Sequence, residues 1–183
     1  MMSARAPRFV FLLSLFVLFI APARGDEPFP YALGVRAGNS FGLDVKYVSE
    51  YELFAERVLP WRWEFSSGIC IGTKLDGLVG VVHGERKPRN TSLLFGLGPG
   101  VSISTARRRF ALEFGFKPAY LREHDFGRHD YGGSLQFISH AGVRVRLGDR
   151  YQLGYRFQHL SNSSAASTNP GYNSHMLEFV VLF

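Results

Sequence analysis

Large apolar residues alternate with small or charged ones, with a period of two, through most of the chain after Pro30. Because successive side chains of a β-strand point to opposite faces, this period indicates strands whose two faces meet different surroundings. No segment after Pro30 shows a convincing helical period. Eight segments alternate in this way: residues 31–38, 41–47, 61–71, 92–101, 110–117, 135–147, 151–158 and 176–183. The chain is therefore expected to be all-β.

The volumes of the two faces decide which face is inside. One face of each segment is bulky and often aromatic, whereas the other mixes glycine, small residues and charge. The interior of an eight-stranded barrel is narrow, so small residues and paired charges fit it better than stacked aromatics. An eight-stranded antiparallel transmembrane β-barrel with its apolar face toward lipid is predicted. The alternative is a soluble, lipocalin-like barrel. The charges expected in the lumen are Arg62, Glu64, Glu113, Lys117, Arg144, Arg146, Arg156 and Glu178.

The connections between these segments differ in length. Those at 104–108 and 148–150 are tight, and those at 73–90, 122–132 and 162–174 are long. Outer-membrane barrels have short periplasmic turns and longer outer loops, so the 162–174 loop is expected on the outer surface. Residues 52–60 form a further expected connection, which is long for a periplasmic turn.

The first 25 residues have the layout of a signal peptide. Arg5 and Arg8 precede an apolar run over residues 9–20, and Ala21-Pro22-Ala23 supplies the small residues of a cleavage site. The run is too short for a spanning helix. Residues 1–25 are therefore predicted to be removed, leaving 26–183 as a single domain. The alternative is an uncleaved anchor helix.

Charge and cysteine content narrow the class of protein further. Residues 26–183 carry 18 basic and 15 acidic side chains, a mild excess that suits anionic partners such as lipopolysaccharide phosphates without identifying one. There is no basic helical stripe or motif for nucleic acid. Cys70 is the only cysteine, so an exported domain of this size needs a source of stability other than disulfides, and a closed barrel is one.

A polar cluster is expected on the lipid-facing side of the last two strands. His159 and Ser161 share the parity of the apolar residues of segment 151–158, and Asn173 and His175 share that of the final segment. Glu178 has the opposite parity and belongs to the lumen.

A histidine and a serine two residues apart on one face can work as base and nucleophile. His159 would take the serine proton, and Ser161 Oγ would attack an ester carbonyl. Because idle polar groups on a lipid-facing wall are costly, the position favours a hydrolase that cuts a lipid from the side. The alternative is that these are polar strand-end residues that merely meet lipid headgroups.

Residues 159–183 resemble the end of the PagL-type lipid A 3-O-deacylases. The resemblance rests on His159-Leu-Ser-Asn162, on Asn169-Pro-Gly-Tyr-Asn173 and on a short final strand. It implies an eight-stranded barrel in the bacterial outer membrane with a catalytic Ser/His pair on the outside of its wall. Lipid A or lipopolysaccharide of the outer leaflet would be the partner, with no cofactor and no metal. The sequence carries no signal for an oligomeric state.

The resemblance also implies roles for residues around the pair. His159 would be the general base and Ser161 the nucleophile. Asn162 and Asn169 match asparagines that would shape the site around the oxyanion. Backbone N–H groups after the serine, such as that of Ser164, are candidates for the oxyanion hole. Beyond the motif, Phe137 falls where the family has an aromatic residue beside the site, although ordinary packing toward lipid explains it equally well.

The chain departs from the family at one position. A glutamate that orients the histidine stands fourteen residues after it in the family, and here that residue is Asn173. An asparagine carbonyl can accept the imidazole N–H, but it supplies no charge to the imidazolium. This change is consistent with a slower deacylase, with a site of different geometry, or with an idle structural or adhesion-type barrel. It is also consistent with a plain turn role for Asn173.

Other polar residues carry weaker signals. His124, Asp125, His129 and Asp130 fall in one loop and could bind a cation, although a solvated loop is the simpler interpretation. Cys70 and His140 are expected to face the lumen. An aromatic girdle is expected from Trp61, Trp63 and Tyr151.

Overall fold

The structure is a computed structural model that describes residues 29–41, 48–85, 90–105, 109–127, 129–164 and 168–183. The expected signal peptide, residues 1–25, lies outside these ranges, as does most of the expected strand 41–47. Within the described ranges, no helix is long and apolar enough to cross a membrane.

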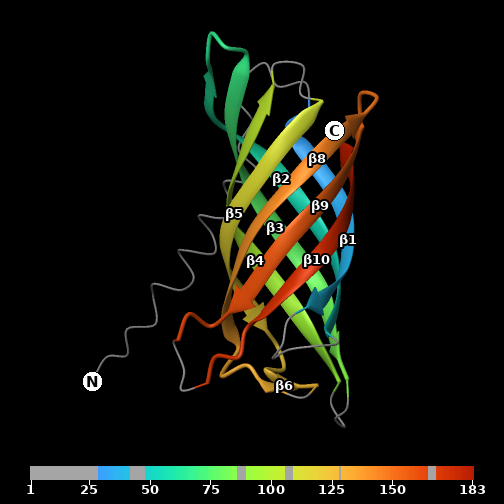
Figure 1. Cartoon of the computed structure of the whole chain (residues 1–183), viewed down its shortest axis with the longest axis vertical. Coiled ribbons are helices and arrows are strands. Elements are labelled where there is room, and N and C mark those ends of the chain that lie inside the picture. The colour runs from blue at the N-terminus through green and yellow to red at the C-terminus, as the bar shows by residue number, and fades with distance from the viewer. Residues whose placement is uncertain (1–28, 42–47, 86–89, 106–108, 128, 165–167) are drawn as a thin grey trace, which may run out of the picture.

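Eight long antiparallel strands close into a barrel (Figure 1), which confirms the predicted fold class. Around the barrel the strand order is β1-β10-β9-β8-β5-β4-β3-β2. The first and last strands pair directly, from Ala32 opposite Leu182 to Phe41 opposite Asn173. The strands are β1 (Tyr31–Phe41), β2 (Val48–Glu64), β3 (Ile69–Gly84), β4 (Thr91–Thr105), β5 (Phe110–Leu121), β8 (Leu135–Leu147), β9 (Tyr151–Ser161) and β10 (Tyr172–Leu182).

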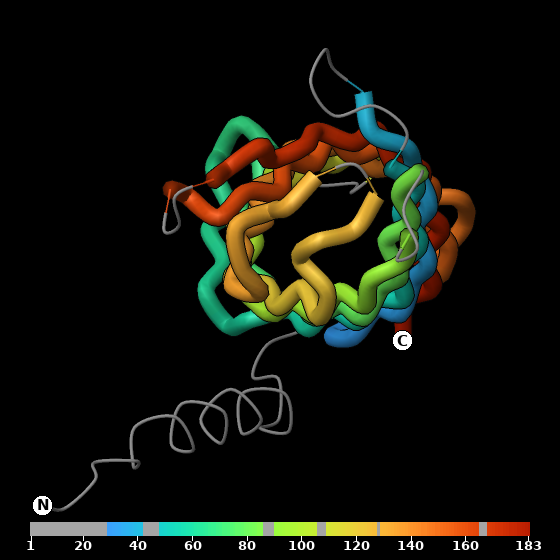
Figure 2. Tube along the Cα trace, turned by 90° about the horizontal axis from the view of Figure 1, so that it is seen from below, coloured from blue at the N-terminus to red at the C-terminus, as the bar shows by residue number. Residues whose placement is uncertain are grey.

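The two ends of the barrel differ. One end, here called the turn end, has the short β2–β3 and β8–β9 turns, and the other, the loop end, has the longer β5–β8 and β9–β10 connections. The β5–β8 connection contains a small hairpin of β6 (Asp125–Phe126) and β7 (His129–Asp130). Figure 2 shows this connection lying across the opening of the loop end. Phe126 and Tyr131 from it are almost fully buried and stack at 4.9 Å.

Two expected connections are strands in the structure. Residues 52–60 lie within β2, and residues 73–84 lie within β3. The expected strand 61–71 instead spans the β2–β3 turn, where Gly68 has a φ of 79°. The apolar residues before and after this four-residue turn are all odd-numbered. The ends of two strands therefore look like one continuous strand in the sequence. Residues 73–84 look like a loop in the sequence because they contain charges and glycines. The charged residues among them that face inward belong to the polar lumen of the barrel.

The bulky face of the sheet is outside, as expected for a membrane barrel. Leu177 is 71% exposed and Phe110 is 63% exposed, although both are large and apolar. Large apolar side chains of this kind face outward on all eight strands. In water they would have no apolar surroundings to contact, so this face is suited to lipid. The soluble alternative, with the bulky face inside, is therefore wrong.

The lumen is filled by a network of ion pairs. Glu178 contacts three guanidinium groups, from Arg36 at 3.4 Å, Arg144 at 2.8 Å and Arg156 at 2.6 Å. Asp76 accepts Lys117 Nζ at 2.7 Å. Five of the charges expected in the lumen are buried there: Glu113, Lys117, Arg144, Arg156 and Glu178. The sequence-based set lacked Glu52, Glu56, Lys74 and Asp76, because their segments had been assigned to connections.

Phe54, an aromatic residue in the lumen, shows how closely the volumes of neighbouring side chains in the lumen are matched. Phe54 faces inward and is 1% exposed, and the Arg36 guanidinium lies 3.7 Å from its ring centre. A Cβ added at Gly34 would come within 2.3 Å of the Phe54 ring. The glycine of β1 therefore makes room for the aromatic ring of β2.

We predict that Glu178→Leu destabilises the barrel by about 3–5 kcal/mol, because it leaves three buried guanidinium groups without their shared carboxylate. The measurement is urea unfolding of the refolded protein, followed by heat-modifiable mobility on gels. Phe179→Leu, one residue further on the lipid-facing side, is the control and should unfold close to wild type. Equal midpoints for the two variants would contradict this prediction.

Candidate active site

The pairing of β9 with β10 brings the expected catalytic residues together. Asn173 is the direct cross-strand partner of His159. Ser161, two residues further along β9, has the same parity as His159 and therefore lies on the same outward face. All three side chains are half-buried. Asn173 thus lies within β10 and not in a turn, which removes the turn interpretation.

A hydrogen bond orients the histidine. His159 Nδ1 and Asn173 Oδ1 are 2.8 Å apart. Because an amide oxygen only accepts, the ring nitrogen in this bond carries the proton, with the amide assigned as in the structure. Nε2 is then the basic nitrogen of the neutral ring, which is the tautomer that a general base needs. The asparagine oxygen thus accepts the bond that an orienting carboxylate would accept.

Ser161 stands next to the histidine without bonding to it. Within the part of the chain that the structure describes, Ser161 Oγ and the His159 ring form no hydrogen bond. Such bonds are often long in ligand-free enzymes and tighten when substrate binds. A rotation of the serine side chain about its Cα–Cβ bond changes the distance between Ser161 Oγ and the His159 ring without moving the strand.

Gly171 closes the site from the loop side, a role that the sequence did not indicate beyond the Pro-Gly pair. A Cβ built at Gly171 would lie 3.4 Å from Ser161 Cβ and 3.5 Å from His159 Cε1. The backbone of Gly171 has a φ of 49°, in the region that glycine adopts most easily. The loop therefore approaches the catalytic pair at a residue without a side chain.

Asn162 turns away from lipid and ties the loops together. Its side chain is buried, and its Nδ2 donates to the Tyr131 carbonyl at 3.0 Å and to the Thr168 carbonyl at 2.6 Å. Its backbone N–H donates to Asn169 Oδ1 at 3.0 Å. The two asparagines therefore fix the backbone that follows Ser161.

Ser164 belongs to the same network. Its backbone N–H donates to Asn162 Oδ1 at 2.9 Å. Ser163 and Ser164 both have positive φ, 52° and 62°, so the turn is tightly wound. The Ser164 donor is thus occupied in this structure, and it can reach an oxyanion only by exchanging that bond.

The β5–β8 connection supports the network from inside the barrel. Gln136 Nε2 donates to the Tyr131 and Gly133 carbonyls, at 3.1 and 2.6 Å. A Cβ at Gly132 would come within 2.1 Å of the Thr168 carbonyl oxygen and 2.6 Å of Asn162 Nδ2. The close approach of the two loops therefore requires glycine at 132.

Phe137 lies on the strand next to Ser161. Phe137 on β8 is the cross-strand partner of Ser161, and its ring stacks on Phe116 at 5.6 Å. Both rings lie on the outer face of the barrel, so they border the serine on the side away from Asn173.

The remaining candidates are separate from this site. His124 Nδ1 bonds Asp130 Oδ1 at 2.8 Å, and the same oxygen accepts the Gly132 N–H. No group of three or more His, Cys, Asp or Glu side chains in the described ranges could hold a metal ion. Cys70 and His140 are buried, as expected of lumen residues, and Trp61, Trp63 and Tyr151 are exposed near the turn end.

A comparison with protein-family models matches residues 49–181 to the lipid A 3-O-deacylase family PagL. The matched range covers more than half of the chain and includes the whole site. The chain belongs to the PagL family. The protein is accordingly an outer-membrane member of a family of lipid A deacylases.

One solved structure agrees with the fold. The crystal structure of the outer membrane enzyme PagL superimposes with a TM-score of 0.73 at 17% identity, covering 83% of this chain and 99% of that chain. The Yersinia pestis outer membrane protein Ail in a phospholipid bilayer nanodisc is more distant, with a TM-score of 0.46 at 10% identity and the same coverage. A search of curated proteins found no match.

We predict that Asn162→Ala loosens the backbone after Ser161, because the Ser164 N–H loses its acceptor and two carbonyls lose their donor. Losing such buried bonds costs about 1–3 kcal/mol, so backbone hydrogen exchange at residues 162–164 and 168 should be roughly tenfold faster or more. Exchange measured by mass spectrometry on the folded protein tests this. Ser163→Ala, an exposed neighbour, is the control, and unchanged exchange in Asn162→Ala would contradict the network.

Proposed function

We propose that this protein removes the ester-linked 3-O acyl chain of lipid A by a serine esterase mechanism, with Ser161 as nucleophile and His159 as general base. The observation that carries the proposal is the hydrogen bond from His159 to Asn173 on the lipid-facing wall, beside a serine of the same face. Membership of the PagL family supports the substrate class.

The first half-reaction forms an acyl-enzyme. His159 Nε2 takes the proton from Ser161 Oγ as that oxygen bonds to the ester carbonyl carbon. The tetrahedral intermediate carries its negative charge on the former carbonyl oxygen. The imidazolium then returns the proton to the sugar oxygen as the bond between that oxygen and the carbonyl carbon breaks. The deacylated lipid leaves with a free hydroxyl on the sugar.

The second half-reaction uses water. The neutral His159 takes a proton from water, the resulting hydroxide oxygen attacks the acyl carbon, and the bond to Ser161 Oγ breaks as the serine regains a proton from the imidazolium. The product is a free fatty acid. No cofactor or metal is required by these steps.

The position of the site suits a substrate that stays in the membrane. A lipid in the outer leaflet can place its ester at the loop end of the barrel while its acyl chain lies along the apolar wall. The loop end would face the outside of the cell, as the pattern of long and short connections predicts. Lateral entry from the leaflet then needs no opening of the barrel.

Asn173 sets the expected rate. It holds the ring of His159 in the required tautomer, but it does not stabilise the imidazolium as a carboxylate would. In a serine protease the corresponding loss of charge and tautomer control costs roughly 10⁴ in rate. Here the tautomer is retained and only the charge is missing, so we expect a smaller penalty and a slow but functional enzyme.

We predict that Ser161→Ala abolishes acyl-chain release, with a loss of about 10³-fold or more, because the nucleophile is removed. Mass spectra of lipid A, from cells with and without the expressed protein, measure the missing acyl chain. Ser163→Ala is the control and should keep wild-type activity. Release by Ser161→Ala with an intact, heat-modifiable barrel would exclude the serine mechanism, and no release by the wild type would leave an idle barrel.

We further predict that Asn173→Glu raises the turnover number by roughly tenfold or more, because a carboxylate beside His159 Nδ1 stabilises the imidazolium. Asn173→Ala should lower it, since the ring loses its orienting partner. Turnover is measured with purified lipid A in detergent micelles. Asn90→Glu, in the β3–β4 connection, controls for the added negative charge. A large loss in Asn173→Glu would mean that the amide N–H₂ has a role of its own.

A further inference from the structure

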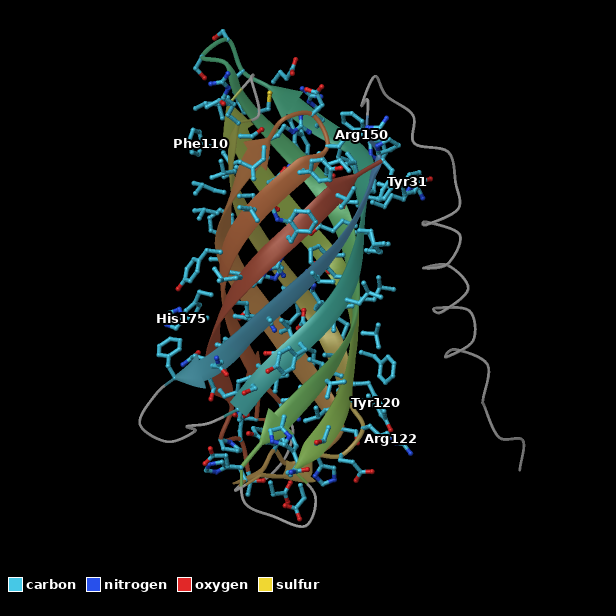
Figure 3. The ribbon with its side chains drawn as sticks, turned by 90° about the vertical axis from the view of Figure 1, so that its right-hand side faces the viewer. Tyr31, Phe110, Tyr120, Arg122, Arg150 and His175 are labelled. Carbon is cyan, nitrogen blue, oxygen red and sulfur yellow. The ribbon has the colours of Figure 1, made fainter. Side chains whose placement is uncertain are left out.

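One polar side chain lies on the otherwise apolar outer face of β8, next to the candidate site. Ser139 is exposed, and it is the direct cross-strand partner of His159. Large side chains project from the outer wall around it, as Figure 3 shows for Phe110 on the adjoining strand β5. The other outward residues of β8 are apolar: Leu135, Phe137, Ala141, Val143, Val145 and Leu147. Ser139 is therefore a polar exception in a surface suited to lipid.

The hydroxyl of Ser139 is open to the membrane side. Among the residues that the structure describes, none forms a hydrogen bond with Ser139 Oγ. A serine hydroxyl can donate one hydrogen bond and accept two, and hydrocarbon can satisfy none of them. A polar group that faces hydrocarbon without a partner costs free energy. The position therefore favours a partner that comes from the lipid.

Ser139 lies on the line that an acyl chain would follow from Ser161 into the membrane. Ser161 pairs with Phe137, so Ser139 is one strand over and two residues nearer the turn end. With about 4.8 Å between strands and about 3.3 Å per residue, the two serines are roughly 8 Å apart, on a line at about 36° to the strands.

The tilt of the strands turns this line along the barrel axis. Strands of such barrels tilt by about 35–45°, which matches the angle between the strands and the line from Ser161 to Ser139. Figure 1 shows β8 on the turn-end side of β9, so the tilt and the line have the same sense. Ser139 is therefore directly deeper in the membrane than Ser161, where the chain of a bound ester would begin.

The surroundings of Ser139 suit such a chain. Ser139 and Ala141 are short, whereas their cross-strand partners on β5 are the aromatic residues Phe116 and Phe114. On β9, the partner of Ala141 is Phe157. An acyl chain that passes over the two short residues would contact aromatic rings on both sides.

The chemistry of the substrate indicates which group would meet the Ser139 hydroxyl. A plain hydrocarbon chain has no hydrogen-bonding group to offer. The sugar of the substrate lies on the opposite side of the ester, toward the loop end. The remaining possibility is a hydroxyl group on the acyl chain itself, close to the carbonyl carbon.

The distance between the two serines indicates where on the chain that hydroxyl lies. Before attack, the carbonyl carbon lies about 3–3.5 Å from Ser161 Oγ. Three single bonds of about 1.5 Å lead from this carbon to a hydroxyl oxygen on the third carbon of the chain, and a hydrogen bond adds about 2.8 Å. A path of about 10 Å that bends at each carbon spans the separation of roughly 8 Å.

We infer that Ser139 is a specificity residue that hydrogen-bonds a hydroxyl group on the third carbon of the acyl chain, so that the site selects 3-hydroxyacyl esters. This inference rests on the proposed function, because it concerns the chain whose ester Ser161 would attack. The bond would hold the start of the chain against β8 and thereby place the carbonyl carbon beside Ser161 Oγ.

The experiment compares two esters that differ in one oxygen atom. Both probes are lipid A monosaccharide analogues, one with a 3-hydroxytetradecanoyl ester and the other with a tetradecanoyl ester at the same position. Release of fatty acid by the full chain in detergent micelles gives kcat/KM for each. We expect the wild type to prefer the hydroxylated ester about tenfold, and Ser139→Ala to bring the ratio within about twofold of one.

Matched variants separate recognition of the hydroxyl from general effects on the wall. Ser139→Thr keeps a hydroxyl at this position and should keep the preference. Val143→Ala shortens another outward side chain of β8, and it should leave the ratio unchanged because it affects both esters alike. Heat-modifiable mobility on gels confirms that each variant forms the barrel.

A binding measurement makes the test independent of hydrolysis. In the Ser161→Ala background, native mass spectrometry in micelles measures the affinity for each ester. The hydroxylated ester should bind about fivefold more tightly, and adding Ser139→Ala should remove this difference.

The outcomes distinguish this inference from the proposed function. Equal rates for the two esters in the wild type, or an unchanged preference in Ser139→Ala, would overturn the role of Ser139 and leave the hydrolase standing. Loss of hydrolysis of both esters in Ser139→Ala would also overturn it, because the serine would then act on the reaction itself. The expected binding preference without any hydrolysis by the wild type would overturn the hydrolase alone.

Discussion

The contact on which the other features depend is the one between Glu178 and the three guanidinium groups in the lumen. A carboxylate in this position cannot face lipid, so it fixes the register of β10. A shift of one residue would place Glu178 outside and turn Asn173 into the lumen. The same contact joins β1, β8 and β9 to β10, because its arginines come from those three strands. The charge network of the lumen therefore also determines which side of the wall carries His159, Ser161 and Asn173.

The candidate site combines this rigid wall with a loop that is held from inside. Asn162 is the link between them: it follows Ser161 directly, and its buried side chain bonds the backbone of the β5–β8 and β9–β10 connections. The backbone near Ser161 is thus fixed by buried groups of the two connections. A site that opens toward hydrocarbon gains from this arrangement, since the polar groups that shape it are satisfied within the protein and not exposed to the acyl chains.

Parity predicted the sides of β8, β9 and β10 correctly, because each of these strands is bounded by clear turn residues such as those at 148–150. It failed for β2 and β3, where the apolar period ran through a turn and inward charges such as Lys74 and Asp76 imitated a loop. The pairing of His159 with Asn173 followed from the strand assignment, and the same parity directs the Asn162 side chain inward. The hydrogen-bond partners of Asn162 could not be predicted, because they are carbonyl groups of residues 131 and 168, which no local sequence pattern identifies.

A neutral amide at Asn173 suits the surroundings of the site. A charged group at the edge of the hydrocarbon region needs a cation or water to remain ionised, whereas a neutral amide does not. The lipid-facing neighbours of Asn173 are His159, Phe41 and His175, none of which carries a fixed positive charge. An asparagine keeps the imidazole oriented in such surroundings without burying an unpaired charge. Compared with a carboxylate, the amide gives less stabilisation to the imidazolium, and an ester held firmly beside Ser161 would offset part of that loss.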